Sequence, residues 1–242
     1  MGFSLELKGV GYSYEGIGRV LSGVGFSLEA GEVLGIISHV GGGKSTLLKI
    51  AAGIIRPQEG ELLIDGVDFW SRPVPFHYDT RRRMGFDFQE AALIANMTIF
   101  QNLALPLRYH GERSEREITD FVDEKLNDLE LSAFRDRLPA ALSAGLRRRI
   151  SFLRAVLERR EFYFWDEPTQ GASSAFMATV ADAITEAKGR GAGSLVATQN
   201  SSFLARVASR ILVLDDGGVK FFGQMEGGRI PVAVETEGML RE

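Results

Sequence analysis

A glycine-rich segment, SHVGGGKST at residues 38–46, constrains the fold of this chain more than any other feature. It follows the continuous apolar run EVLGII (32–37) and leads into KSTLLKIAAGII (44–55), a predicted helix that Arg56-Pro57 and Gly60 would end. An apolar run without polar alternation is typical of a strand buried on both faces. A buried strand, a glycine-rich turn and a helix in this order are the context that a phosphate-binding loop requires.

Strands and helices also alternate in the second half of the chain, which predicts an α/β fold with a mostly parallel sheet. Short apolar runs are typical of buried strands at residues 162–165, 194–198, 211–215 and 219–222. Apolar residues at helical spacing lie between them: Ile150, Leu153, Val156 and Leu157, then Phe176, Val180 and Ile184.

The residues before the glycine-rich segment have the pattern of an antiparallel sheet. Apolar and polar residues alternate in two stretches, with Phe3, Leu5, Leu7, Val24, Phe26 and Leu28 as the apolar members. In ELLIDGVDF (61–69), Asp65-Gly66 between two short apolar runs predicts a hairpin. A further alternating run at 81–89 carries Met84, Phe86 and Phe88.

Residues of about 90–150 form a predicted all-helical insert. Thr98 with Gln101 and Ser114 with Glu117 have the spacing of capping boxes. The second helix would bury one face, formed by Ile118, Phe121, Val122, Leu126 and Leu129. We therefore expect one domain over 1–242, with its core at 1–89 and 150–223, the helical subdomain at about 90–150 and a short tail at 224–242.

Composition excludes several classes of protein. The chain has no Cys and three His, which excludes a disulfide scaffold and a thiolate metal site and makes a His-based zinc site a poor fit. Lys and Arg number 28 against 32 Asp and Glu, for a net charge of −4, which argues against general nucleic-acid binding. No apolar run approaches the ~18 residues of a membrane span, and the start lacks a signal-peptide pattern, so we expect a cytosolic protein.

The glycine-rich segment contains the residue types that bind nucleotide phosphates. Gly41, Gly42 and Gly43 would let backbone N–H groups face a phosphate at a helix N-terminus. Lys44 would reach the β- and γ-phosphates, the Ser45 hydroxyl would ligate Mg²⁺, and Thr46 would bond the α-phosphate. The complete pattern has glycine at position 38, where this chain has Ser38, and Ser is tolerated there if its φ is negative.

The run FYFWDE (162–167) supplies a second part of the same site. Four apolar residues followed by Asp predict a strand whose carboxylate emerges at the sheet edge where α/β proteins bind ligands. Asp166 would hold Mg²⁺ through water, and Glu167 would orient and polarise the attacking water as general base. A solvated acidic turn is the alternative for this pair taken alone.

With these motifs in order, the chain resembles the nucleotide-binding subunits of ATP-binding cassette transporters over nearly its whole length. The resemblance implies a P-loop NTPase core of the RecA-like type with an inserted helical signature subdomain. It implies that Tyr14, or Tyr12 in its place, stacks on adenine, and that Gln89 contacts Mg²⁺ and the attacking water. LSAGL (142–146) is similar to the family signature, which assigns Ser143 and Gly145 to the γ-phosphate held by the opposite subunit.

The cofactors and partners implied by the resemblance are ATP, Mg²⁺, a second ATPase subunit in a homodimer, and a transmembrane permease. The subunit would lie on the cytoplasmic face of the membrane and contact it through the permease, with no nucleic-acid partner. NLALPLRYH (102–110) is similar to subunits of bacterial lipid transporters.

Five positions depart from the family pattern and leave a second function open. Beside Ser38, these are Ala144 and Leu146 in the signature, Ser173 where Asp is usual, and Gln199 where the family has a switch histidine. Gln199 can donate a hydrogen bond but cannot shuttle a proton. The alternative is therefore a nucleotide-sensing module with little or no turnover. A cassette protein acting on DNA or ribosomes is disfavoured, because the chain lacks a coiled coil and carries one cassette.

Overall fold

The computed structural model describes residues 4–111 and 113–225 and divides the chain into two compact units. The core unit comprises the chain up to Phe86 and from Arg160 onward, and the helical unit comprises Asp87–Arg159. Phe3 and most of the predicted tail lie outside the described residues. The helical unit extends beyond residue 150, where the sequence analysis places its end, because one continuous helix crosses that position.

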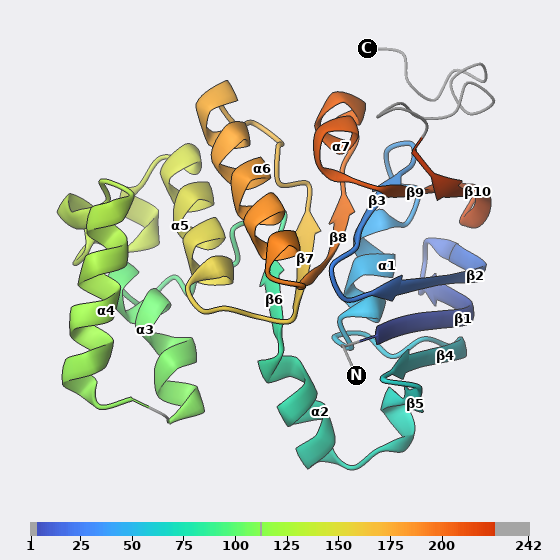
Figure 1. The fold of residues 1–242 in the computed structure, drawn as a ribbon, viewed down its shortest axis with the longest axis horizontal. Coiled ribbons are helices and arrows are strands. Elements are labelled where there is room, and N and C mark those ends of the chain that lie inside the picture. Colours follow the sequence, from blue (N-terminus) through green and yellow to red (C-terminus); the bar gives the residue numbers. More distant parts are fainter. Residues whose placement is uncertain (1–3, 112, 226–242) are drawn as a thin grey trace. The chain divides into compact units, whose positions relative to one another are not determined.

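A six-stranded sheet forms the centre of the fold (Figure 1), in the order β10-β9-β3-β8-β7-β6. Its strands are β3 (Val33–Ile37), β6 (Met84–Asp87), β7 (Phe162–Asp166), β8 (Gly193–Ala197), β9 (Arg210–Asp215) and β10 (Gly218–Gln224). The pairs β3–β8, β3–β9 and β7–β8 are parallel, and only the β9–β10 pair among those with a described register is antiparallel. The predicted mostly parallel sheet is confirmed.

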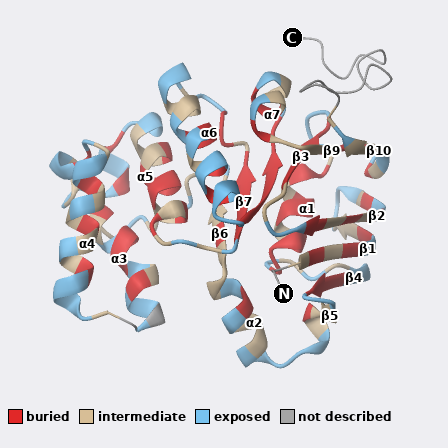
Figure 2. Ribbon diagram, in the orientation of Figure 1, coloured by how far each residue is buried: buried red, intermediate tan, exposed pale blue. Residues whose placement is uncertain are grey.

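Helices pack against the sheet because its central strands β3, β8 and β7 are buried along their whole length (Figure 2). Leu34 and Ile36 of β3 belong to the same core cluster as Leu47 and Leu48 of α1 (Lys44–Ala51). Gly35, between them, faces the opposite way, and a Cβ there would contact Leu204 of α7 (Ser201–Val207). Helix α6 (Ser174–Gly189) also contacts β8.

Helix α1 ends at Ala51, so its predicted extent to residue 55 is wrong. Gly53 has a φ of 64°, a left-handed conformation that ends the helix before Arg56-Pro57 is reached. The N–H groups of Ile54 and Ile55 both bond the Lys49 carbonyl, which closes the last turn.

The predicted N-terminal antiparallel sheet is confirmed, in the order β2-β1-β4-β5. Its strands are β1 (Ser4–Tyr14), β2 (Gly18–Glu29), β4 (Glu59–Ile64) and β5 (Val67–Asp68). Asp65 and Gly66 have φ values of 52° and 75°, the left-handed pair that a two-residue hairpin turn of type I′ needs. The short turn η1 (Phe69–Ser71) and helix α2 (Val74–Arg82) follow.

The helical unit contains α3 (Ile99–His110), α4 (Glu115–Asp128) and α5 (Ala144–Val156), with the short turns η2 (Ser132–Phe134) and η3 (Pro139–Ala141). Both predicted capping boxes are present, at Thr98 and Ser114. Its core joins residues of all three helices: Ile99, Leu103, Ala104, Leu107, Ile118, Val122, Leu126, Leu131, Leu142, Ile150, Leu153 and Leu157. Phe121 and Leu129 pack against this core.

Within residues 4–111 and 113–225, none of the helices combines the length and the apolar character that a membrane crossing needs.

Gly193, at the start of β8, provides a test of the core packing. A Cβ at this position would lie 2.5 Å from Cε2 of the buried Phe162 ring, so Gly193→Ala must displace the ring or the strand. We expect Gly193→Ala to lower the free energy of unfolding by about 1–3 kcal/mol, as overpacking of a core typically does. Denaturant unfolding measures this. Gly189→Ala is the control, because a Cβ there meets open space, and an equal loss in both variants would contradict the packing described.

Candidate nucleotide-binding site

The loop after β3 turns sharply into α1 because two of its glycines adopt left-handed backbone conformations. Gly41 has a φ of 78°, and Gly43, the N-cap residue of α1, has a φ of 85°. The Gly42 N–H donates to the His39 carbonyl at 3.1 Å, which closes the turn. The loop therefore places the N-terminus of α1 beside the carboxyl ends of the parallel strands.

Lys44 is the first residue of α1, and its buried side chain extends back toward the loop. Its Nζ donates to Oγ and to the carbonyl oxygen of Ser38, at 3.3 and 3.4 Å, and lies 3.6 Å from Oε1 of Glu167. Ser38 has no positive φ, and its hydroxyl donates to the His39 carbonyl at 2.9 Å. Serine is thus accommodated at position 38, because its φ is not positive, as expected for a residue other than glycine.

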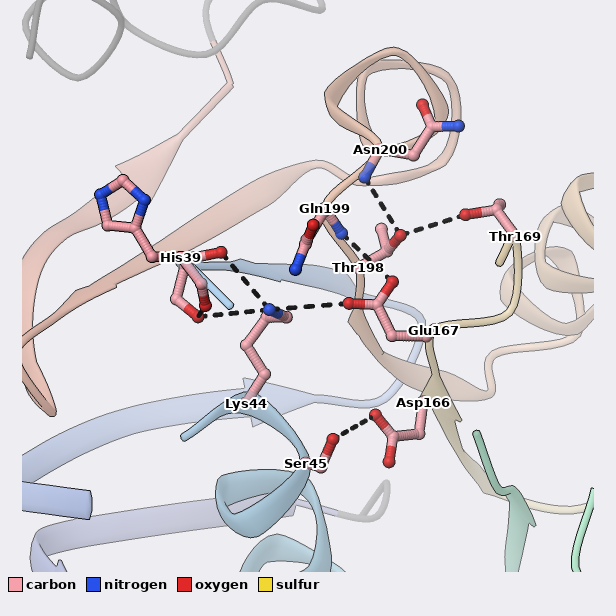
Figure 3. A network of polar contacts seen from close by, with 10 residues as sticks. His39, Lys44, Ser45, Asp166, Glu167, Thr169, Thr198, Gln199 and Asn200 are labelled. Carbon is pink, nitrogen blue, oxygen red and sulfur yellow. Dashed lines mark hydrogen bonds and ion pairs between the residues drawn. The ribbon is translucent and has the colours of Figure 1, made fainter. Parts of the chain in front are cut away.

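Asp166 and Glu167 emerge at the end of β7, as predicted, and face the loop (Figure 3). The Ser45 hydroxyl donates to Oδ1 of Asp166 at 2.8 Å, and Asp166 is only 2% exposed. Glu167 has a φ of 47°, and its N–H donates to the Ala197 carbonyl of β8 at 2.8 Å. This bond ties the left-handed turn to the neighbouring strand and fixes where the Glu167 side chain starts.

Trp165 lies directly before Asp166 and is 1% exposed. Its ring stacks on that of Tyr163 with the centroids 5.5 Å apart, and its Nε1 donates to Oγ of Ser194 at 3.4 Å. The aromatic packing on this face of β7 therefore supports the backbone that carries Asp166.

Gln199 follows β8 and lies beside Glu167. Its backbone N–H is 3.3 Å from Oε2 of Glu167, and its side chain points toward the space between Lys44 and Glu167 (Figure 3). Next to these residues lies a hydroxyl pair that the sequence did not indicate: Thr169 and Thr198, whose buried Oγ1 atoms are 3.1 Å apart. A threonine at the carboxyl end of an apolar strand is the signal that could have indicated it.

Tyr14 ends β1 and reaches the first turn of α1, with its hydroxyl 3.3 Å from Oγ1 of Thr46. The Tyr12 ring packs edge-on against Tyr14, with the centroids 5.0 Å apart. Tyr14, the first of the two tyrosines predicted to stack on adenine, thus contacts the helix that carries Lys44.

Three of the predicted site residues belong to the helical unit. Ser143 is the N-cap of α5, and its Oγ accepts from the Leu146 N–H at 3.3 Å. Gly145 lies in the first turn of α5 and is exposed, as is Gln89 after β6. The signature thus presents a capped helix N-terminus, where backbone N–H groups favour an anion.

The core-unit residues fit a magnesium nucleotide chemically. A lysine and backbone N–H groups at a helix N-terminus suit phosphate oxygens. Mg²⁺ prefers oxygen ligands and retains several waters. The Ser45 hydroxyl and the Asp166 carboxylate, whose oxygens lie 2.8 Å apart, are ligands of this kind.

Comparisons with known proteins agree with this geometry. A family profile described as "ABC transporter" matches residues 21–170. The chain is 32% identical to the "Probable ribonucleotide transport ATP-binding protein mkl" of Mycobacterium leprae, over 93% of this chain and 65% of that protein. It is 28% identical to the "Lipopolysaccharide export system ATP-binding protein LptB" of Haemophilus influenzae, over 86% of both. The chain thus spans about two thirds of the length of the mkl protein.

Among solved structures, the chain is similar to one described as "Dimeric structure of a post-hydrolysis state of the ATP-binding cassette MJ0796 bound to ADP and Pi". The TM-score is 0.84 and the identity 28%, over 92% of this chain and 99% of the other. With the loop around Lys44, the carboxylates at the end of β7 and the family match over more than half of its residues, the chain belongs to the ABC transporter family of ATP-binding proteins.

Proposed function

We propose that this chain binds and hydrolyses ATP as a subunit of a membrane transporter. The observation that carries the proposal is the convergence of Lys44, the Ser45–Asp166 pair and Glu167 at one edge of the sheet. These residues come from two distant segments and supply a cation for phosphates, oxygen ligands for a metal ion and a carboxylate for water.

In this mechanism the loop binds the triphosphate. The N–H groups of Gly41 and Gly43 face its oxygens, whereas the Gly42 N–H stays bonded to the His39 carbonyl. Lys44 contacts the β- and γ-phosphates, and Thr46 contacts the α-phosphate. Tyr14 stacks on the adenine. Ser45 and Asp166, the latter through water, would hold Mg²⁺ together with Gln89, and the ion would neutralise charge on the phosphates.

Glu167 orients and polarises the attacking water as general base. Its carboxylate is already held by the Gln199 N–H and lies near Lys44, so its position is defined before a substrate binds. The Gln199 side chain donates a hydrogen bond to the γ-phosphate but carries no proton through the reaction.

ATP would close a homodimer, with Ser143 and Gly145 of one subunit contacting the γ-phosphate held by the other. The dimeric form in which the similar cassette MJ0796 was solved supports this arrangement. Relatives named for ribonucleotide transport and lipopolysaccharide export support a permease partner and a place on the cytoplasmic face of the membrane. Their cargoes differ, so the cargo of this chain is left open.

A nucleotide-sensing module with little turnover is the second candidate, favoured by Gln199 and Ser173. Ser173 is the N-cap of α6, where its Oγ accepts from the Phe176 N–H at 3.3 Å. It fills a structural position in place of the usual acidic residue. The two candidates share ATP binding and differ in whether Glu167 supports turnover.

Lys44→Ala tests nucleotide binding. Because a hydrogen bond to a charged group contributes about 1.5–3 kcal/mol, we expect the dissociation constant of a fluorescent ATP analogue with Mg²⁺ to rise about 10- to 100-fold. Fluorescence titration of the purified chain measures it. Lys49→Ala is the matched control, because Lys49 lies in the last turn of the same helix. Equal affinity in wild type and Lys44→Ala would contradict the proposed site.

Glu167→Gln tests hydrolysis. We expect phosphate release by the assembled transporter to fall at least about 100-fold, the usual contribution of a general base, while the ATP analogue binds as tightly as before or more tightly, because a charge that competes for Lys44 is removed. Glu61→Gln on the exposed part of β4 is the control. Binding without any Glu167-dependent release would support the sensing module instead.

A further inference from the structure

A buried ion pair in the helical unit lies next to Gln89 and has no part in the mechanism above. Asp87 is 1% exposed and Arg148 of α5 is 8% exposed. Nη2 of Arg148 donates to Oδ2 of Asp87 at 2.8 Å, and the Ser151 hydroxyl donates to Oδ1 at 2.9 Å. Both carboxylate oxygens of Asp87 are thus bonded to side chains of α5, which fixes the orientation of the Arg148 guanidinium.

Arg148 also bonds the backbone that carries Gln89. Its Nη1 donates to the carbonyl oxygens of Phe88 and Gln89, the latter at 3.3 Å. The Gln89 residue itself is exposed. The guanidinium therefore holds the peptide units on either side of the Gln89 Cα.

A second arginine of α5 bonds the backbone just after Gln89. Arg154 donates to the carbonyl oxygens of Ala92 and Ala91, at 2.9 and 3.4 Å. Ala91 and Ala92 have φ values of 35° and 39°, a backbone conformation that persists only where its surroundings impose it. Burial lowers the pKa of Arg154, and the charge of Asp87 opposes that shift, but an arginine remains a cation at neutral pH.

Asn102 of α3 bonds the other end of this segment, at residues 94–98. The buried Asn102 side chain accepts from the Ile94 N–H at 2.7 Å and donates to the carbonyls of Ile94, Met97 and Thr98. The backbone from Phe88 to Thr98 is therefore fixed within the helical unit at both ends, and α5 determines the end that bears Gln89.

We propose that Arg148, oriented by Asp87, is a positioning residue for Gln89. The proposal rests on the role of Gln89 at Mg²⁺ and water given above. It also has a mechanical consequence, because the signature residue Ser143 caps α5, which carries Arg148 in its second turn. When nucleotide contacts the signature residues and shifts α5, the bonds from Arg148 move the Gln89 backbone with the helix.

The experiment is a double-mutant cycle on the assembled transporter, with phosphate release measured as a function of Mg²⁺ and ATP concentration. Removal of a group that orients a metal ligand typically costs about 10- to 100-fold in activity or metal affinity. We expect Arg148→Gln to lower turnover by about this factor and to raise the Mg²⁺ concentration for half-maximal rate. The affinity for the ATP analogue should change less than about twofold, because Lys44 is in the other unit. In the Gln89→Ala background, Arg148→Gln should add less than about twofold.

Arg135→Gln is the matched control. Arg135 pairs with Asp123 at 2.7 Å in the same unit, and no described contact joins it to residues 87–92. Its loss should leave the Mg²⁺ dependence unchanged. Asp87→Asn keeps the shape of the Arg148 partner and should shift the Mg²⁺ dependence in the same direction, which preserves the test if Arg148→Gln does not fold.

The outcomes separate the two proposals. If Gln89→Ala leaves turnover and Mg²⁺ dependence unchanged, the proposed role of Gln89 is wrong and the positioning role falls with it. If Gln89→Ala lowers turnover and Arg148→Gln lowers it by the same factor in the wild-type and Gln89→Ala backgrounds, Arg148 does not act through Gln89. Only the further inference is then overturned.

Discussion

The burial of the Lys44 ammonium is the constraint on which the rest of the site depends. A cation removed from water needs acceptors, and this one has the hydroxyl and carbonyl of Ser38 and the carboxylate of Glu167. Those acceptors follow the ends of β3 and β7, so the parallel sheet must bring both ends to the same edge, where β8 alone separates them. The left-handed glycines of the loop then bring the lysine between them.

The sequence predicts those parts of the fold that follow from local chemistry. The apolar run of β3, the Asp65-Gly66 turn and the capping boxes at Thr98 and Ser114 each form as expected. Helix α2 was not predicted, because VPFHYDTRR has one buried residue, Thr80, and no apolar stripe. Helix α1 is shorter than predicted because Gly53 adopts a left-handed conformation, which the neighbouring residues of the sequence do not indicate.

The site shows the same division. Lys44, Ser45, Asp166 and Glu167 could be named from their motifs, but the bond between Ser45 and Asp166, 121 positions apart, depends on the order of the strands. Thr198 could be noticed at the end of an apolar strand, but its contact with Thr169 could not be predicted. The bonds from Arg148 to the backbone around Gln89 could not be predicted either, because no motif pairs these positions. The predicted roles of Gln89, Ser143 and Gly145 remain predictions, because they concern nucleotide and a second subunit.

Trp165 has a consequence for how this chain can be studied. It is one of two tryptophans in the sequence, and the other, Trp70, lies in the turn after β5. Its indole is fixed by stacking and a hydrogen bond, one peptide from the Asp166 carboxylate, so we expect its emission to respond to the charge at that carboxylate. The chain thus carries its own optical reporter for events at the end of β7, without an introduced dye.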